Sequence, residues 1–289
     1  MTAPRPTRIV DAHVHLWDPA NTEWYPYLGG GRDLGMGDVR GMARRFTPEA
    51  YAAEAAGWNV EKLVNVAAAT GDHSVAETLA LDRHAEPDGQ PWAIVGGLPH
   101  ASPHEQVAMV DTQMEAPRFC GVRPMSPKAP PVPDDVVLDA LAERDLVFEL
   151  MAHPPDLVNA AQRLAAHPDL TVVVEHAGWP RSSTDEERAL WAEGMAALAG
   201  AGPQVHCKLS GLAMPLGAMS ADAFRPWVEG AIEAFGADRC LFASNFPVDG
   251  LHGTLDQLWS AYAEVTAGAS GPDRDALFAT NAERVYGCA

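Results

Sequence analysis

Eight short apolar segments recur along the chain, and each is followed by a segment with helical character. This alternation constrains the fold more than any other feature, because strands that alternate with helices form parallel sheets. The clearest segment reads Leu-Thr-Val-Val-Val-Glu-His, which is apolar and β-branched as a strand buried on both faces should be. The predicted strands span residues 9–15, 60–69, 93–98, 119–123, 146–152, 170–176, 204–210 and 240–244.

The number of strand–helix units predicts how the sheet closes. A chain of 289 residues with 47% hydrophobic residues can surround one core with eight such units. We therefore predict a single-domain (β/α)8 barrel, the TIM-barrel fold, over residues 1–289. An open doubly wound sheet is the main alternative, but no Gly-x-Gly-x-x-Gly motif follows the first strand and no Walker loop is present.

The charge balance limits the partners. The chain has 39 acidic and 20 basic residues, a formal net charge of -19, which repels phosphate backbones and anionic lipids. We expect no nucleic-acid or membrane partner, and a small-molecule substrate instead. No apolar run is long enough to span a bilayer and no secretory signal is visible, so a cytoplasmic protein is expected. The sequence leaves open whether the chain forms a homo-oligomer.

Two histidines, His13 and His15, end the first predicted strand. Alternate residues of a strand point to one face, so both imidazoles project the same way, about 6 to 7 Å apart. That spacing lets both converge on one metal ion or one carbonyl oxygen. Such a pair also arises by chance, but its position at a strand end before a long aromatic loop favours a functional site.

Polar residues also follow later strands, at the mouth where barrel active sites are built. His176 ends a buried strand, where an imidazole must find partners, so we expect it to be a ligand or to polarise a carbonyl. His153 precedes two prolines and could either contact substrate or simply end its strand. Arg123 suits a bidentate bond to a substrate carboxylate or an ion pair with a neighbouring acid.

Lys208 lies between apolar neighbours near the end of the seventh predicted strand. Burying an unpaired ammonium is costly, so the side chain must have a polar environment. It either faces the substrate pocket or pairs with an acid such as Glu149 or Glu175.

A long segment, residues 16–46, follows the first strand and is rich in aromatic residues and glycine. A loop of this length inside a compact domain is typical of a lid or binding loop. We expect Trp17 and Tyr25 from this segment, and Trp179 from the loop after the sixth strand, to form walls of the substrate pocket. Ordinary packing beneath the loop is the alternative.

Five short motifs share an order and spacing that is more specific than any one of them. They are Val-Asp-Ala-His-Val-His-Leu-Trp at 10–17, Glu-His-Ala-Gly at 175–178, Lys-Leu-Ser-Gly at 208–211, Phe-Ala-Ser-Asn-Phe-Pro-Val-Asp at 242–249 and Asn-Ala-Glu-Arg-Val-Tyr at 281–286. Over nearly the whole chain, this set resembles the amidohydrolase superfamily, and within it the amidohydrolase-related barrels that include fuconolactonase and rhamnonolactonase. The resemblance implies hydrolysis of a lactone or a similar C–O bond. In more distant zinc-dependent relatives it implies non-oxidative decarboxylation.

One position departs from the family. The last strand of these barrels usually ends in Ser-Asp-x-Pro, whose Asp is implied to be a metal ligand and general base, and here that place is Asn245. An amide cannot take a proton near neutral pH, so the usual base is missing. Asp249, four residues later, could fold back over the pocket as a replacement base. Its alternative role is structural, to cap the next helix or to bind a loop amide.

The same departure bears on a metal. Without a carboxylate at residue 245, the implied site offers the imidazoles of His13, His15 and His176, with no negative charge to offset a divalent cation. We therefore expect zinc to bind weakly or not at all.

Together these features predict a hydrolase of the lactonase type that acts on a lactone or ester of a small, polar, carboxylated compound. Water would attack the carbonyl while His13, His15 and His176 stabilise the oxyanion, with or without a metal. A zinc-dependent decarboxylase and a barrel that binds a ligand without turnover are the alternatives.

Overall fold

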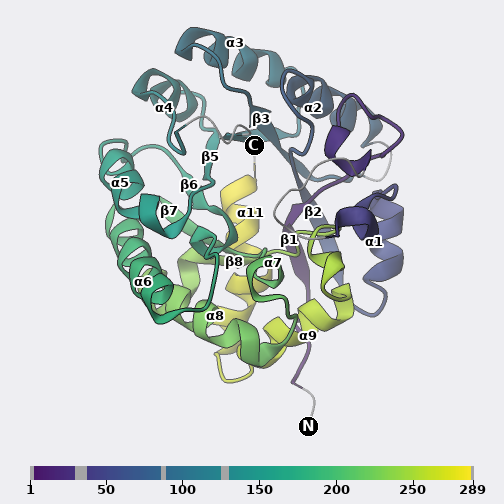
Figure 1. The fold of residues 1–289 in the computed structure, drawn as a ribbon, viewed down its shortest axis with the longest axis vertical. Coiled ribbons are helices and arrows are strands. Elements are labelled where there is room, and N and C mark those ends of the chain that lie inside the picture. Colours follow the sequence, from purple (N-terminus) through teal and green to yellow (C-terminus); the bar gives the residue numbers. More distant parts are fainter. Residues whose placement is uncertain (1–2, 30–37, 86–88, 125–129, 288–289) are drawn as a thin grey trace.

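The computed structural model describes residues 3–29, 38–85, 89–124 and 130–287. Eight parallel strands follow one another in chain order around a nearly closed barrel, and helices ring its outside (Figure 1). The (β/α)8 barrel predicted from the sequence is confirmed. The strands are β1 (Ile9–Val14), β2 (Val60–Val66), β3 (Ala93–Leu98), β4 (Phe119–Pro124), β5 (Val147–Leu150), β6 (Val172–Val174), β7 (Val205–Leu209) and β8 (Cys240–Phe242).

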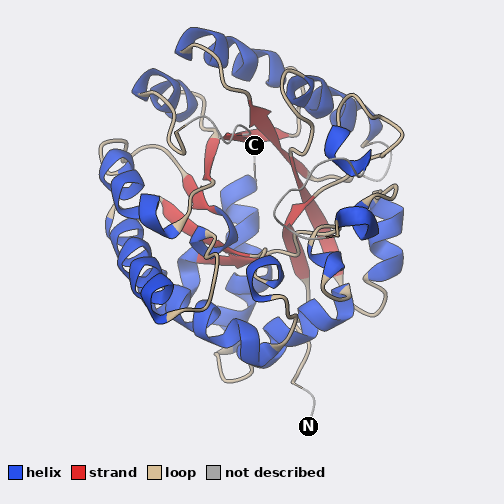
Figure 2. Ribbon diagram, viewed as in Figure 1, coloured by secondary structure: helices blue, strands red, loops and turns tan. Residues whose placement is uncertain are grey.

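The helices begin at the capping signals of the sequence and cover the sheet (Figure 2). Thr47 and Ser102, for example, accept hydrogen bonds from backbone N–H groups in the first turns of the helices that follow them. The helices are α1 (Pro48–Glu54), α2 (His73–His84), α3 (Pro103–Gln113), α4 (Asp135–Ala142), α5 (Pro154–Leu164), α6 (Asp185–Gly200), α7 (Ala213–Leu216), α8 (Ala221–Phe235), α9 (Leu255–Val265), α10 (Gly271–Asp275) and α11 (Asn281–Tyr286).

The interior of the barrel below its carboxyl-terminal mouth is filled by one compact apolar cluster. Alternate residues of the strands point inward, where Val, Ala and Leu side chains meet the residues of α11. In Figure 1, α11 lies inside the ring of helices. The described residues of this part of the barrel therefore form a packed core below the carboxyl-terminal mouth.

β1 contains an irregularity that re-aims its side chains. Asp11 pairs with Leu63 and Val14 with Asn65, so three steps along β1 match two steps along β2. One extra residue of this kind forms a β-bulge, which shifts the in–out alternation of a strand. Ala12 belongs to the interior cluster and His13 also faces inward, which a regular strand would not allow.

β8 returns to β1 and completes the barrel. The backbone N–H of Asn245 donates to His13 O at 2.8 Å, and that of His15 donates to Phe246 O at 2.8 Å. The carboxylate of Asp11 accepts the backbone N–H of Ser244 at 2.8 Å and the hydroxyl of Tyr51 at 2.7 Å. These bonds hold the first and last strand ends in one register, so the residues at 13, 15 and 245 become neighbours.

Some predicted elements differ from the structure. The sixth strand ends at Val174, and the next residues form a turn, η3 (Glu175–Gly178), in which His176 has a left-handed backbone. The last helical segment of the chain is divided by a π-helical turn, η6 (Ala276–Thr280), which lies between α10 and α11. Part of the predicted loop at 16–46 lies outside the described residues. Among the helices described, none is long and apolar enough to cross a membrane.

Candidate active site

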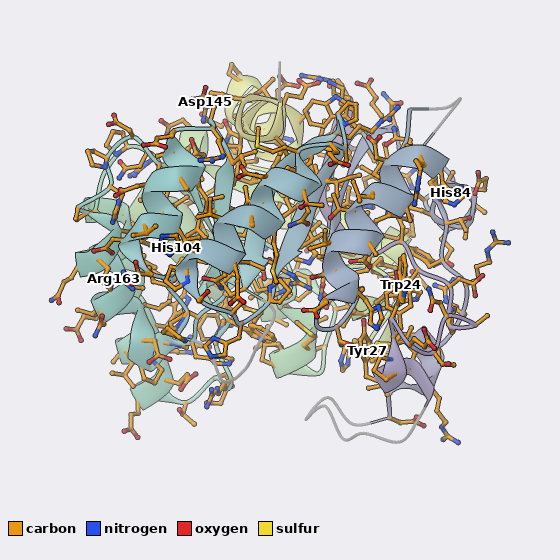
Figure 3. The ribbon with its side chains drawn as sticks, turned by 90° about the horizontal axis from the view of Figure 1, so that it is seen from above. Trp24, Tyr27, His84, His104, Asp145 and Arg163 are labelled. Carbon is orange, nitrogen blue, oxygen red and sulfur yellow. The ribbon has the colours of Figure 1, made fainter. Side chains whose placement is uncertain are left out.

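A cavity of 200 Å³ lies at the carboxyl-terminal mouth of the barrel. Figure 3 shows Tyr27, from its wall, at the opposite end of the barrel from Asp145, which precedes β5. Six residues predicted for the site line it, so the sequence and the structure point to the same place. The lining residues are His15, Trp17, Tyr27, Met42, Ala68, Thr70, Arg123, Met151, His176, Trp179, Met214, Asn245 and Val248.

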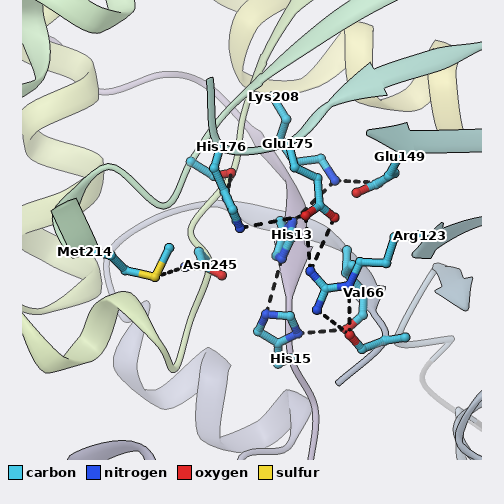
Figure 4. Close-up of polar contacts among 12 residues, drawn as sticks. His13, His15, Val66, Arg123, Glu149, Glu175, His176, Lys208, Met214 and Asn245 are labelled. Carbon is cyan, nitrogen blue, oxygen red and sulfur yellow. Dashed lines mark hydrogen bonds and ion pairs between the residues drawn. The ribbon is translucent and has the colours of Figure 1, made fainter. Parts of the chain in front are cut away.

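His13 and His15 converge as the sequence predicted. Their Nε2 atoms lie 3.3 Å apart, and both side chains are buried (Figure 4). Burial, followed by the charge of Arg123, lowers the pKa of His15 to about 3, and burial and Lys208 lower the pKa of His13 below its usual range. Both imidazoles are therefore neutral at physiological pH. His15 lines the cavity, whereas His13 lies behind it.

The hydrogen bonds of these two imidazoles have a defined direction. His15 Nδ1 lies 2.7 Å from Val66 O, and a carbonyl can only accept, so Nδ1 carries the proton and Nε2 of His15 is an acceptor. Two Nε2 lone pairs cannot face each other at 3.3 Å, which places a proton on His13 Nε2. His13 Nδ1 then accepts from the Lys208 ammonium at 3.5 Å. Proton donation thus runs from Lys208 through His13 to His15 and Val66.

The direction of these hydrogen bonds corrects one part of the mechanism expected from the sequence. We predicted that both imidazoles could donate to an oxyanion. The neutral His15 side chain gives its one N–H to Val66 O, and its one lone pair, on Nε2, accepts from His13 in the resting site. The reason is a tertiary contact between β1 and the end of β2 that the strand pattern does not reveal.

His176 reaches the cavity from a strained turn. Its φ is 51°, a left-handed conformation that is uncommon for residues other than glycine. The turn brings Nδ1 to 2.8 Å from the Ser210 hydroxyl and Nε2 to 3.9 Å from a Glu175 oxygen. A Cβ on Gly211 would lie 2.5 Å from His176 Nδ1, so only glycine leaves room for this ring.

The tautomer of His176 follows from its neighbours. Glu175 is buried, which raises a carboxyl pKa, but Arg123 overcomes that effect and the pKa of Glu175 is about 2. A lone pair on His176 Nε2 would face this carboxylate, so Nε2 carries the proton and Nδ1 accepts from Ser210. Burial lowers the pKa of His176 to about 4, so the ring is neutral. His176 therefore supplies an N–H donor beside the cavity.

Arg123 is the one cation among the described residues that line the cavity. Its Nε and Nη2 donate to Ala67 O at 3.0 and 2.5 Å, and Nη1 lies 3.2 Å from Glu175. A guanidinium has five N–H donors, so at least one remains for a ligand. The sequence allowed either a bond to a substrate carboxylate or an ion pair with a neighbouring acid. Arg123 can make both, because it pairs with Glu175 and still lines the cavity.

Asn245 also has a left-handed backbone, with a φ of 56°, which asparagine tolerates better than most residues. Its Nδ2 donates to Asp249 Oδ1 at 2.9 Å and approaches Met214 Sδ at 3.7 Å. Because the amide N–H groups point to these partners, Oδ1 is left as an acceptor. Asn245 thus presents an oxygen to the cavity.

Asp249 does not fold back over the pocket as the sequence allowed. It is fully buried below Asn245 and is not part of the cavity wall. It does not cap α9 either, because Thr254 does so. Burial raises the pKa of Asp249 to about 7 against the hydrogen bond from Asn245. The carboxyl can act on the cavity only through the amide that it holds.

Lys208 pairs with a buried acid, which is the second of the two environments that the sequence allowed. Its ammonium lies 2.6 Å from Glu149 Oε1, and neither side chain is exposed. Tyr286 donates its hydroxyl to the same oxygen at 2.7 Å, so α11 anchors this pair from below. Burial raises the pKa of Glu149, and the Lys208 ammonium opposes that rise. Lys208 supports His13 beneath the cavity and does not reach a ligand there.

Two other predicted contact residues lie away from the cavity. Tyr25 donates its hydroxyl to Glu77 at 2.8 Å and lines a separate cavity of 530 Å³ beside α1 and α2. His153 lies against Trp179, with Nδ1 3.0 Å from Trp179 O, and is not among the lining residues. Both therefore hold loops that bound the site.

Sequence reasoning missed the methionine wall. Met42, Met151 and Met214 line the cavity from three different segments. Met151 directly follows β5, at a strand end like those that carry the predicted polar residues. This position was the available signal, but a thioether is neither an acid nor a base and does not stand out among candidate catalytic residues.

The described residues include one cluster of side chains that could bind a metal ion. His13, Glu149 and Glu175 each offer a ligand atom, and these atoms lie within 4.8 Å of one another. Lys208, however, already contacts both Glu149 and His13 with its ammonium (Figure 4). The space between the ligand atoms therefore already has a cation.

The pair of His13 and His15 does not fit a tightly held zinc ion either. Their 3.3 Å spacing suits two zinc ligands, but zinc needs both Nε2 lone pairs. His13 would have to move its proton to Nδ1, where it would point at the Lys208 ammonium. Asn245 adds no negative charge. The residues present thus do not fit a firm zinc site, and no chemical step is derived through a metal.

Comparisons with known proteins agree with this architecture. The family model described as Amidohydrolase matches residues 10–288. An uncharacterised protein, y4mH of Sinorhizobium fredii, is 32% identical over 96% of this chain and 98% of its own. An L-fucono-1,5-lactonase of Burkholderia ambifaria is 30% identical over 96% of this chain and 94% of its own. A solved structure of an amidohydrolase from Burkholderia multivorans with bound zinc has the same fold, with a TM-score of 0.83, 24% identity and coverage of 98% of this chain and all of the other.

Proposed function

The chain belongs to the amidohydrolase family and is a hydrolase, and we propose that it hydrolyses a lactone or ester of a small carboxylated compound. One observation carries this proposal. The acceptor Nε2 of His15, the N–H donor of His176, the acceptor oxygen of Asn245 and the cation of Arg123 come together at one cavity of 200 Å³. Ester hydrolysis needs an acceptor for the proton of water, a donor for the oxyanion and a means of holding the substrate.

Arg123 binds the carboxylate of the substrate in this scheme. It is the cation at the cavity, and no carboxylate lies among the described lining residues to compete for it there. Its position is fixed by Ala67 O and Glu175, so little side-chain freedom is lost when a ligand binds. The cavity therefore favours a substrate with one negative charge.

The reaction needs three further groups. Asn245 Oδ1 accepts a hydrogen bond from the attacking water. This water displaces the bond from His13 to His15 Nε2, and His15 Nε2 then takes its proton as the new C–O bond forms. His176 Nε2–H donates to the carbonyl oxygen as it becomes an oxyanion. When the tetrahedral intermediate collapses, the ring or ester C–O bond breaks and the leaving oxygen recovers the proton from His15. The product of a lactone is an open-chain hydroxy acid.

His15 is a weak base in the resting site, since its pKa is about 3, but the imidazolium that forms is transient. The negative charge of Glu175 acts in its favour. The ring orientation is held by Val66 O whether or not Nε2 is protonated. The base predicted at Asp249 is replaced in this proposal by a group that lines the cavity.

The names of relatives support the lactone as the first substrate class to test. An L-fucono-1,5-lactonase is 30% identical to this chain over nearly the whole of both proteins. The zinc-dependent decarboxylase, the alternative from the sequence, requires a firm metal site, and Lys208 and Asn245 both weigh against one. We also propose that zinc, where it binds at all, binds weakly.

The experiment compares the same substitution at three histidines on a panel of carboxylated lactones. His15→Asn should lower kcat by about 10² to 10⁴, and His176→Asn by about 10² to 10³. His153→Asn serves as the control, because this imidazole lies outside the cavity wall, and should change kcat little. Melting temperatures verify that the variants fold. Equal loss in all three variants, or an inert wild-type protein across the panel, would refute the proposal.

A further inference from the structure

The residues that line the cavity but take no part in the reaction determine which substituents the substrate can carry on its ring. Resting on the proposed function, we infer that the substrate is a monocyclic carboxylated lactone whose ring carries hydrogen, alkyl or unsaturated carbon groups and no free hydroxyls. Apart from the reactive groups, most of the side chains that line the cavity are apolar, which favours such a body over a sugar ring.

Apolar side chains form this part of the cavity wall. Met42 comes from the short helix η2 (Val39–Met42), Met151 follows β5 and Met214 lies in α7. Trp17 and Val248 continue the surface between them. Thioether and aromatic surfaces gain from contact with apolar carbon, and they offer no strong hydrogen bond to a hydroxyl.

Three of the donor groups among these lining residues are already engaged. Tyr27 donates its hydroxyl to Ala68 O at 2.9 Å, and Thr70 Oγ1 donates to Trp24 O at 3.3 Å. The indole N–H of Trp17 donates to Arg44 O at 3.1 Å. The O–H or N–H of each of these three side chains is thus bonded to a backbone carbonyl and is not available to a sugar hydroxyl.

Besides the indole N–H of Trp179, the polar side chains that remain available among the described lining residues are those of the reaction. His15, His176 and Asn245 serve the water and the carbonyl, and Arg123 serves the carboxylate. A ring hydroxyl would lose its bonds to water on entering the cavity and would find these three donors engaged. Such a loss costs about 1 to 3 kcal/mol, which corresponds to a kcat/KM that is about 5-fold to 150-fold lower for each hydroxyl.

The volume limits the size of the ring system. A cavity of 200 Å³ equals the liquid volume of about six or seven water molecules. It is below the range of about 300 to 1,000 Å³ that is usual for larger ligands. One lactone ring with a carboxylate and short substituents is what such a space can enclose.

The test uses two six-membered lactones on the wild-type protein. Both are δ-lactones with one carboxylate at the same ring position, and one carries a methyl substituent where the other carries hydroxyl groups. We expect kcat/KM to be at least tenfold higher for the first. Met151→Gln places an amide in the apolar wall and should shift the ratio toward the hydroxylated lactone by about tenfold. Met151→Leu keeps the wall apolar and should leave the ratio unchanged.

The outcomes separate this inference from the proposed function. Hydrolysis with a preference for the hydroxylated carboxylated lactone overturns the inference and leaves the hydrolase proposal standing. If neither lactone is hydrolysed, the proposed function fails, and calorimetric binding of the two ring-opened hydroxy acids decides the inference. Tighter binding of the methyl-substituted acid supports an apolar body, and tighter binding of the more hydroxylated acid overturns it.

Discussion

Asn245, which lines the cavity, donates its side-chain N–H at 2.9 Å to Asp249, which is buried beneath it. The amide occupies the place where the resemblance implies a catalytic carboxylate, and a carboxyl four residues later sets the direction of that amide. Because Asp249 does not reach the cavity wall, the pair orients an acceptor for water and does not itself take the proton of water.

Asp249→Asn tests this assignment. The variant loses the charged partner that fixes the Asn245 amide, so kcat should fall by about tenfold, below the 10² to 10⁴ expected for loss of a general base. Steady-state kinetics on the best lactone, with the melting temperature measured in parallel, gives the answer. A fall of 10² or more with an unchanged melting temperature would identify Asp249 as the base.

The free energy of unfolding should depend on pH because Asp249 ionises at a different pH in the folded and unfolded states. Burial raises its folded-state pKa to about 7, whereas an unfolded Asp titrates near 4. The folded state therefore binds the proton more tightly. The resulting stability is fully present below about pH 4 and is lost as the pH rises toward 7.

Urea unfolding of the wild type and of Asp249→Asn at pH 5 and pH 8 measures this effect. The wild type should lose about 2 kcal/mol of unfolding free energy relative to the variant between the two values. The difference in unfolding free energy between wild type and variant is compared at the two pH values, so the effect of the changed hydrogen bond, which does not depend on pH, cancels. A difference that does not vary with pH would mean that Asp249 titrates at its ordinary pKa.

Lys208→Met should turn the cluster into a metal site. Removing the ammonium leaves Glu149 buried without its cation, which should cost about 3 to 5 kcal/mol of stability. Zinc can then bind His13, Glu149 and Glu175, so adding it should raise the melting temperature of the variant and not that of the wild type. Lys62→Met, which removes a partly exposed lysine paired with Glu283, is the control and should not respond to zinc. A zinc-stabilised wild type would contradict the role given to Lys208.

Asn245→Asp should strengthen zinc binding by restoring one negative charge next to the histidines. The measurement is metal content after loading with zinc and dialysis against a chelator. The wild type should lose its zinc, and the variant should retain more. One zinc ion per wild-type chain after dialysis would revive the decarboxylase alternative.

Arg123→Lys should raise KM for carboxylated lactones by about tenfold or more and change kcat little. Lysine keeps a positive charge beside Glu175, so the fold should tolerate the change, but it lacks the planar fork that binds a carboxylate with two N–H groups. The methyl ester of the same lactone is the matched control, because its KM should not respond. An equal change with the ester would show that Arg123 does not bind the carboxylate.

Local patterns were enough to predict the barrel and the position of its site. Strand runs alternate with capped helices, and parallel strands in a barrel bring their carboxyl ends to one mouth, so His15, Arg123, His176 and Asn245 could be placed together before any coordinates were considered. Residue order along the chain determines which strand ends carry polar side chains, and the sequence displays that order directly.

The roles of these residues depended on contacts between distant parts of the chain. The carbonyl of Val66 makes His15 an acceptor, and Lys208, which is 195 residues from His13, directs the proton of that imidazole. A left-handed backbone brings His176 to the cavity after β6 has ended. Proton positions, pKa values and side-chain partners are set by burial and long-range packing, so only the tertiary structure could decide that Lys208 lies beneath the site and that most of the other lining side chains are apolar.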